Sequence, residues 1–268
     1  MKTKGIGTEY RKKLAKVITS ENDIITPDLV SKILNISLQE AGRILSRWHH
    51  QCWVKRVKRG VYIPIAATDA DGSLSIEDPW ILANNLFSPG YIAGFSAIKH
   101  WDFTDQIFET TTFFTTKQIK NRHPVIGSSR FHLKTISSHK VFGTKNVWRE
   151  NIKIAVSDPT KTIVDLLDDP SIVGGMRIVQ DVFIEYKNTE YYDLDMLVIY
   201  AEKMKNKTIF KRLGFLMETL GLEQDIKKYG LENKISLGYS EFDPGLKNNI
   251  RISRWKLKAT NAWKKSND

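Results

Sequence analysis

Apolar residues between positions 8 and 50 recur with the period of an amphipathic helix, which predicts three successive helices. A threonine followed by a proline is a typical helix start, so Thr26 and Pro27 are predicted to open the second helix. The first helix covers residues 8–19, and its apolar stripe consists of Tyr10, Leu14, Val17 and Ile18.

The third helix has the clearest two-sided pattern. Ser37 followed by Glu40 is typical of a capping box, so this helix is predicted to start at Leu38 and to end near His50. Its inward face is predicted to consist of Leu38, Ala41, Ile44, Leu45 and Trp48.

The opposite face of this helix carries side chains suited to reading DNA bases. Arginine forms paired hydrogen bonds with guanine edges in the major groove, and glutamine does so with adenine. An ordinary solvated helix face has a similar composition, so this helix alone leaves both interpretations open. The candidate face consists of Gln39, Arg43, Ser46, Arg47 and His50, of which Arg43 and Arg47 are the strongest candidates for base contacts.

Two strand-like segments, residues 53–57 and 61–65, follow the third helix and favour the DNA interpretation. Their turn is basic, and clustered cations repel one another in a folded chain but suit contacts with DNA phosphates. Helices followed by such a hairpin predict a winged helix-turn-helix at the N-terminus. The predicted phosphate contacts are Lys55, Arg56, Lys58 and Arg59, with Gly60 completing the turn.

The rest of the chain predicts a second, larger domain. A polar stretch rich in Gly and Asp at 67–75 is the predicted linker between a first domain, residues 1–66, and a second, residues 76–268. Strand-like segments precede a run of helices, which predicts a mixed α+β domain with a mainly antiparallel sheet. The predicted strands cover 107–116, 131–136 and 152–156, with part of another at 147–148, and the predicted helices cover 78–86, 96–101, 158–169, 174–186, 194–204 and 208–220.

The net charge of +11 is concentrated at the two ends of the chain. Residues 1–65 hold 13 Lys and Arg against 5 Asp and Glu, a net charge of +8, whereas residues 66–243 carry −3. Clustered cations gain affinity for nucleic acid by releasing counterions, so duplex DNA is the predicted partner.

The C-terminal segment, residues 244–268, carries +6 together with Trp255 and Trp263. Basic and aromatic residues together can bind nucleic acid by charge and stacking. The favoured interpretation is a last strand with its cations outward and an apolar side formed by Ile250, Ile252, Trp255 and Leu257.

Composition excludes several classes of protein. No segment approaches the roughly 18 consecutive apolar residues of a membrane span, and no apolar run follows the basic N-terminus as in a signal peptide. Cys52 is the sole cysteine, so no intrachain disulfide forms and a reducing, cytoplasmic setting is expected. No Gly-rich nucleotide loop is present, and neither a cofactor nor a metal is expected, because metal-ligand spacing is absent from His123, His132 and His139.

Candidate catalytic groups are few, and no catalytic residue is expected. Cys52 lies near His49, but the end of the third helix favours a packing role for it. Asp181, Glu185 and Lys187, with Asp165, have the residue types of a metal-dependent nuclease, which is the enzymatic alternative. The spacing of Asp181 and Glu185 is also typical of a solvated helix face.

One helix start has a distinct local pattern. Asp158 is expected to cap the helix that Pro159 opens, and Thr162 and Asp165 are expected to anchor it rather than to react. A buried ion pair between Asp165 and Arg212 is predicted to join two helices.

Short motifs along most of the chain resemble those of the AbiEi-type antitoxins of abortive-infection systems. Lys161 stands where that family usually has arginine, and Pro159-Thr160 replaces its usual pair of residues. The motifs are the helix and hairpin of residues 44–64, Tyr91–Ile98, Ser157–Asp165, Lys211–Leu216, Phe242–Pro244 and Arg254–Leu257.

The resemblance implies a DNA-binding transcriptional autorepressor that is also the antitoxin of a nucleotidyltransferase-like toxin in a phage-defence operon. It implies operator DNA as a partner, with inverted repeats in the protein's own promoter, and neutralisation of the toxin by the C-terminal domain without a stable complex. The alternatives are a nuclease or nucleic-acid-modifying enzyme targeted by its winged helix, and a ligand-sensing transcriptional regulator.

Overall fold

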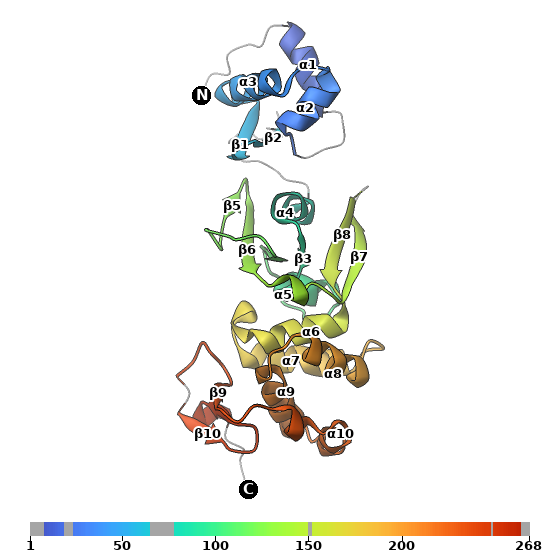
Figure 1. Ribbon diagram of the computed structural model, residues 1–268, viewed down its shortest axis with the longest axis vertical. Coiled ribbons are helices and arrows are strands. Elements are labelled where there is room, and N and C mark those ends of the chain that lie inside the picture. The colour runs from blue at the N-terminus through green and yellow to red at the C-terminus, as the bar shows by residue number, and fades with distance from the viewer. Residues whose placement is uncertain (1–7, 19–23, 65–77, 150–151, 248, 264–268) are drawn as a thin grey trace. The chain divides into compact units, whose positions relative to one another are not determined.

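The computed structural model describes residues 8–18, 24–64, 78–149, 152–247 and 249–263 (Figure 1). Two compact units make up the chain. The first comprises Met1–Leu86 and His123–Phe131, and the second comprises Phe87–Arg122 and His132–Asp268. The linker predicted at 67–75 lies outside the described residues, so the domain boundary there stays a prediction.

The first unit begins with three helices and a hairpin, in the order expected from the sequence. The Thr26 hydroxyl accepts a hydrogen bond from the backbone N–H of Leu29 at 3.2 Å and caps the second helix. The Ser37 hydroxyl accepts one from the backbone N–H of Glu40, also at 3.2 Å, and caps the third. The elements are α1 (Thr8–Ile18), α2 (Pro27–Leu34), α3 (Leu38–His50), β1 (Val54–Lys58) and β2 (Val61–Pro64).

The inward faces of these elements form an apolar core. Two residues predicted to lie in it are at the surface instead, since Ile18 is 38% exposed and Leu38 is 56% exposed. Both are terminal residues of their helices, beyond the stretch that the core covers. Backbone hydrogen bonds of 2.7 and 2.9 Å between Ile25 and Tyr62 connect the hairpin to the segment before α2. The core consists of Leu14, Val17, Ile25, Val30, Ala41, Ile44, Leu45, Trp48, Val54 and Tyr62.

A six-stranded sheet follows, made of β3 (Gly90–Ile92), β4 (Thr110–Thr115), β5 (Val125–Ile126), β6 (Ser129–Thr135), β7 (Thr144–Arg149) and β8 (Ile152–Ser157). The strand order is β5-β6-β4-β3-β8-β7. The pairs β3–β4, β5–β6 and β7–β8 are antiparallel, and β3–β8 is parallel. Two helices occur in the same part of the chain, α4 (Pro79–Phe87) before β3 and α5 (Gly94–His100) after it. The predicted α+β fold class is thereby confirmed, although β4 is shorter than expected and Ile107 before it is 84% exposed.

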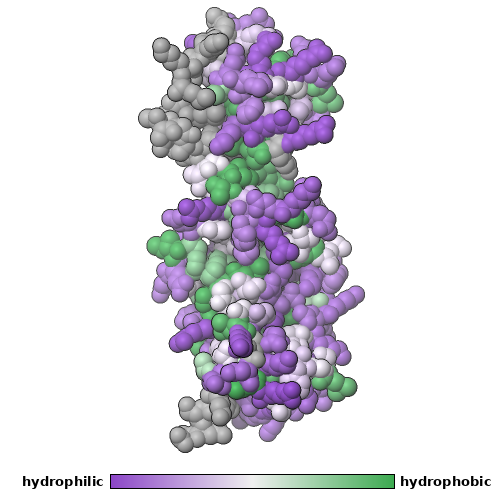
Figure 2. Space-filling view, turned by 90° about the vertical axis from the view of Figure 1, so that its left-hand side faces the viewer, coloured by the Kyte–Doolittle hydropathy of each residue, from purple (hydrophilic) through white to green (hydrophobic). Residues whose placement is uncertain are grey.

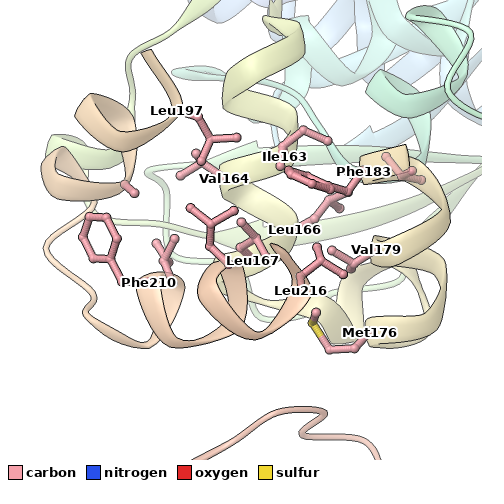
Figure 3. Packing of buried hydrophobic residues seen from close by; sticks show 14 of the residues in the cluster. Ile163, Val164, Leu166, Leu167, Met176, Val179, Phe183, Leu197, Phe210 and Leu216 are labelled. Carbon is pink, nitrogen blue, oxygen red and sulfur yellow. The ribbon is translucent and has the colours of Figure 1, made fainter. Parts of the chain in front are cut away.

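Five further helices are α6 (Pro159–Asp168), α7 (Met176–Lys187), α8 (Leu194–Lys203), α9 (Thr208–Thr219) and α10 (Glu223–Tyr229). As predicted, Asp158 caps α6 by accepting the backbone N–H of Lys161 at 2.7 Å. Within the described ranges, no helix combines the length and the apolarity needed to cross a membrane. Apolar side chains of α6 pack among those of α7, α8 and α9, as Figure 3 shows for Ile163, Val164, Leu166, Leu167, Val179, Phe183, Leu197, Phe210 and Leu216.

The chain ends in a small sheet of β9 (Ser240–Glu241), β10 (Ile250–Ile252) and β11 (Leu257–Ala259), in the order β10-β11-β9. The single last strand predicted from the sequence is therefore two strands. Trp255 lies between them and is fully buried, so it is not available for stacking with a ligand. Its ring lies against α9 at Gly214, where an added Cβ would come within 2.0 Å of Trp255 Cζ3.

Arg212 joins α9 to both α6 and the C-terminal sheet. The predicted ion pair with Asp165 is wrong, because the guanidinium binds backbone carbonyls instead. Carbonyl groups in the last turn of a helix lack a donor within that helix, and the end of α6 obtains one from Arg212. The accepting oxygens belong to Leu167 (2.8 Å), Asp168 (3.0 Å), Glu241 (2.9 Å) and Phe242 (3.0 Å).

Asp165 takes part in a buried polar cluster that the sequence did not predict. Its carboxylate accepts hydrogen bonds from the Lys161 ammonium and, at 3.0 Å, from the Tyr91 hydroxyl. Lys161 also donates to the Tyr91 oxygen at 2.8 Å. The side chains of Lys161 and Asp165 are 0% and 2% exposed, and burial lowers the pKa of Lys161 and raises that of Asp165. Removal of any one of Lys161, Asp165 and Tyr91 therefore takes a hydrogen-bond partner away from the other two.

We expect Gly214→Ala to destabilise the protein by about 1–3 kcal/mol, because the new methyl group overlaps the Trp255 ring and forces it to move. Urea unfolding followed by circular dichroism measures the change. Gly238→Ala is the matched control, since a Cβ there meets nothing within 4 Å. Equal unfolding midpoints for the two variants would contradict the packing described here.

We expect Asp165→Ala to cost about 3–5 kcal/mol, because it leaves Lys161 buried without its counterion. The double variant Lys161→Met with Asp165→Leu should cost much less, since no buried charge remains. Urea unfolding of both variants and the unchanged protein tests this. A double variant as unstable as Asp165→Ala would show that the charges themselves are not the reason.

Candidate nucleic-acid interface

The outward face of α3 is exposed along the whole helix. Residues on the opposite face, from Ala41 to Trp48, are buried in the core, so α3 separates its two faces as predicted. In the view of Figure 2, hydrophilic residues cover most of the visible surface of the described part of this unit. The exposed candidates on α3 are Gln39, Arg43, Ser46, Arg47 and His50.

The two arginines of this face have different surroundings. Arg47 donates a hydrogen bond to the Tyr10 hydroxyl of α1, and its guanidinium carbon lies 4.9 Å from the centroid of the Tyr10 ring. Arg43, one helical turn earlier, has no hydrogen-bond or ion-pair partner among the described residues. Arg43 can therefore contact a ligand without losing a partner, whereas Arg47 has to give up part of its contact with Tyr10 to do so.

The hairpin carries its cations on β1 and in the turn that follows it. Antiparallel pairing places Lys55 opposite Ile63 and Arg56 opposite Tyr62, and the register shifts between Arg56 and Lys58. Gly60 completes the turn with a φ of +74°, a conformation that favours glycine. The side chains of Lys55, Arg56 and Arg59 are exposed, and the side chain of Lys58 lies outside the described part of the chain.

His49 connects α3 to the hairpin. Its Nδ1 atom lies 3.2 Å from the carbonyl oxygen of Val54 and 3.3 Å from the backbone nitrogen of Arg56. Cys52 occupies the turn between these elements with a φ of +59°, and its side chain is exposed. The predicted packing role of Cys52 is therefore wrong, because the left-handed turn carries the thiol to the surface.

The residues weighed as nuclease candidates are not brought together. Asp181, Glu185 and Lys187 are exposed on α7, whereas Asp165 is enclosed with Lys161. Within the ranges that the structure describes, no group of three His, Cys, Asp or Glu side chains is placed to hold a metal ion.

Sequence reasoning missed the two contacts that position the candidate interface. Tyr10 accepts a hydrogen bond from Arg47. The position of Tyr10 on the apolar stripe of the first helix was the sequence feature that could have indicated this contact. His49 holds the hairpin backbone, and nothing in its spacing distinguished it from the neighbouring His50.

Comparison with protein-family models and with curated proteins gave no match. Among solved structures, the chain is similar to the crystal structure of the Rv2827c protein from Mycobacterium tuberculosis, with a TM-score of 0.59 at 12% sequence identity. The similarity covers 95% of this chain and 92% of that one. At this level of identity the likeness shows the fold alone, so the α+β fold described above is one that a crystallised mycobacterial protein shares over nearly its whole length.

Proposed function

We propose that the first unit is a winged helix-turn-helix that binds operator DNA. The observation that carries this proposal is the exposed polar face of α3 together with the exposed cations of the β1–β2 hairpin in the same unit. In winged helices one helix enters the major groove while the hairpin lies along the backbone. These exposed side chains are not part of the core of the unit, which is formed by the opposite face of α3 and by residues such as Val54 and Tyr62 of the hairpin.

In this proposal the two surfaces have different tasks. Arg43 contacts a guanine edge and Gln39 an adenine edge, and these contacts select the sequence. Lys55, Arg56 and Arg59 contact phosphates, and these contacts supply affinity for any duplex. Binding to inverted repeats in its own promoter would make the protein an autorepressor, which places it in the cytoplasm.

We further propose that the protein is the antitoxin of a nucleotidyltransferase-like toxin in a phage-defence operon. The support is the resemblance to AbiEi-type antitoxins through motifs such as Ser157–Asp165 and Lys211–Leu216. These motifs supply the cap of α6 and the Arg212 contacts, so they support a common architecture for the second unit. Co-expression with the toxin of the adjacent gene should restore growth, and co-purification of a tight complex would contradict neutralisation without stable binding.

We expect Arg43→Ala to lose about 1–3 kcal/mol of discrimination between operator and unrelated duplex, because it removes a base contact. A mobility-shift assay compares the promoter fragment upstream of the protein's own reading frame with a scrambled fragment at low ionic strength. Lys187→Ala, an exposed cation of α7, is the control and should change neither affinity. The absence of retardation by the unchanged protein would overturn the DNA-binding proposal.

We expect Lys55→Ala and Arg59→Ala to weaken binding to operator and unrelated duplex by similar factors. Each lost phosphate contact should also reduce the slope of log binding constant against log salt by about 1. Fluorescence anisotropy over a range of salt concentrations measures both effects. An unchanged slope in both variants would show that the hairpin does not lie on the backbone.

A further inference from the structure

The outer face of the C-terminal sheet carries an exposed aromatic ring among cations. Pairing aligns Arg251 of β10 with Lys258 of β11 and Lys258 with Glu241 of β9, so these side chains share one face. Tyr239 precedes Glu241 by two residues and is 39% exposed. The opposite face of the sheet packs on the core through Leu257, Ala259 and partly buried Ile250 and Ile252.

Two cations lie close to the Tyr239 ring. The guanidinium carbon of Arg251 is 5.4 Å from the ring centroid, and the ammonium nitrogen of Lys256 is 5.8 Å from it. Neither cation has a carboxylate partner among the residues that the structure describes. Both cations lie over the ring, and Tyr239 still exposes 39% of its surface to solvent.

Other cations of the same region are neutralised. Lys258 lies 3.6 Å from Glu241, and Lys234 is paired with Glu202. Arg254, adjacent to buried Trp255, contacts three carboxylates, those of Glu218, Glu223 and Glu232. Arg251 and Lys256 differ from these three cations, because no carboxylate among the described residues is paired with either of them.

We propose that Tyr239, Arg251 and Lys256 form a binding site for single-stranded nucleic acid. A base stacks on the exposed tyrosine ring, and the two cations contact the phosphates on either side of it. Every base has a flat π face and every nucleotide a phosphate, so this arrangement suits a single strand without sequence preference. A duplex does not fit, because its bases are already stacked on one another.

The site differs from the stacking site considered from the sequence. Trp255 is buried, and half-buried Trp263 packs against Phe242 with ring centroids 4.8 Å apart, so both rings take part in packing. The exposed ring comes from Tyr239, outside the basic C-terminal segment. The site is also independent of the proposed winged helix, because its residues all belong to the second unit.

The test uses the full-length protein and fluorescein-labelled oligouridylate and oligothymidylate of equal length in fluorescence anisotropy at low salt. We expect Tyr239→Ala to weaken binding by about tenfold or more, and Tyr239→Phe to retain it, because stacking needs the ring but not the hydroxyl. Arg251→Gln and Lys256→Gln should weaken binding and reduce its salt dependence. Tighter binding of oligouridylate identifies RNA as the preferred ligand, tighter binding of oligothymidylate identifies single-stranded DNA, and equal binding shows that the site accepts either.

Two matched controls accompany these variants. Lys258→Gln removes a cation that Glu241 already neutralises, and Trp148→Ala removes an aromatic ring that is 59% exposed on β7, outside the C-terminal sheet. Both should bind as the unchanged protein does. Undiminished binding by a folded Tyr239→Ala variant, or displacement of the oligonucleotide by polyglutamate as readily as by unlabelled oligonucleotide, would overturn the proposal. Failure of operator binding would leave these results unaffected.

Discussion

The second unit depends on the burial of α6 on all sides. A helix enclosed in protein cannot satisfy its terminal N–H and C=O groups with water, so each end needs protein partners. Asp158 supplies one at the N-terminus, and Arg212 supplies them at the C-terminus. Because Arg212 also binds the carbonyl groups of Glu241 and Phe242, one guanidinium links the helical core to the C-terminal sheet. The same enclosure makes Lys161 and Asp165 require each other.

Cations have two different roles in this protein. On α3 and the hairpin, Arg43, Lys55 and Arg59 lie at the surface without acidic partners among the described residues. In the second unit, Lys134 lies 2.8 Å from Asp169 and Lys140 lies 2.7 Å from Asp168, so these cations hold the fold together. Lysine and arginine thus serve both as exposed cations and as cations neutralised within the fold.

Local patterns made much of the fold predictable. The caps at Thr26, Ser37 and Asp158 involve neighbours in the sequence, and the structure has all three. Contacts between distant residues were not predictable, because the sequence does not show which buried groups meet. Arg212 binds backbone carbonyl groups rather than a carboxylate. Every residue has a backbone carbonyl, so the residue types in the sequence do not indicate which carbonyl groups accept hydrogen bonds from Arg212. For the candidate interface, the exposed face of α3 followed from helical periodicity, whereas the contact that engages Arg47 arises from tertiary packing with α1.

The carbonyl groups that Arg212 binds come from two stretches far apart in the chain, near residue 168 and near residue 241. During translation the ribosome releases the first stretch long before the second. Until Glu241 and Phe242 have emerged, the guanidinium lacks two of its acceptors, and Gly214 lacks the indole that covers it. The second unit can thus reach its final form only after Trp255 has been synthesised, and a chain released before that point would expose this surface to chaperones and proteases.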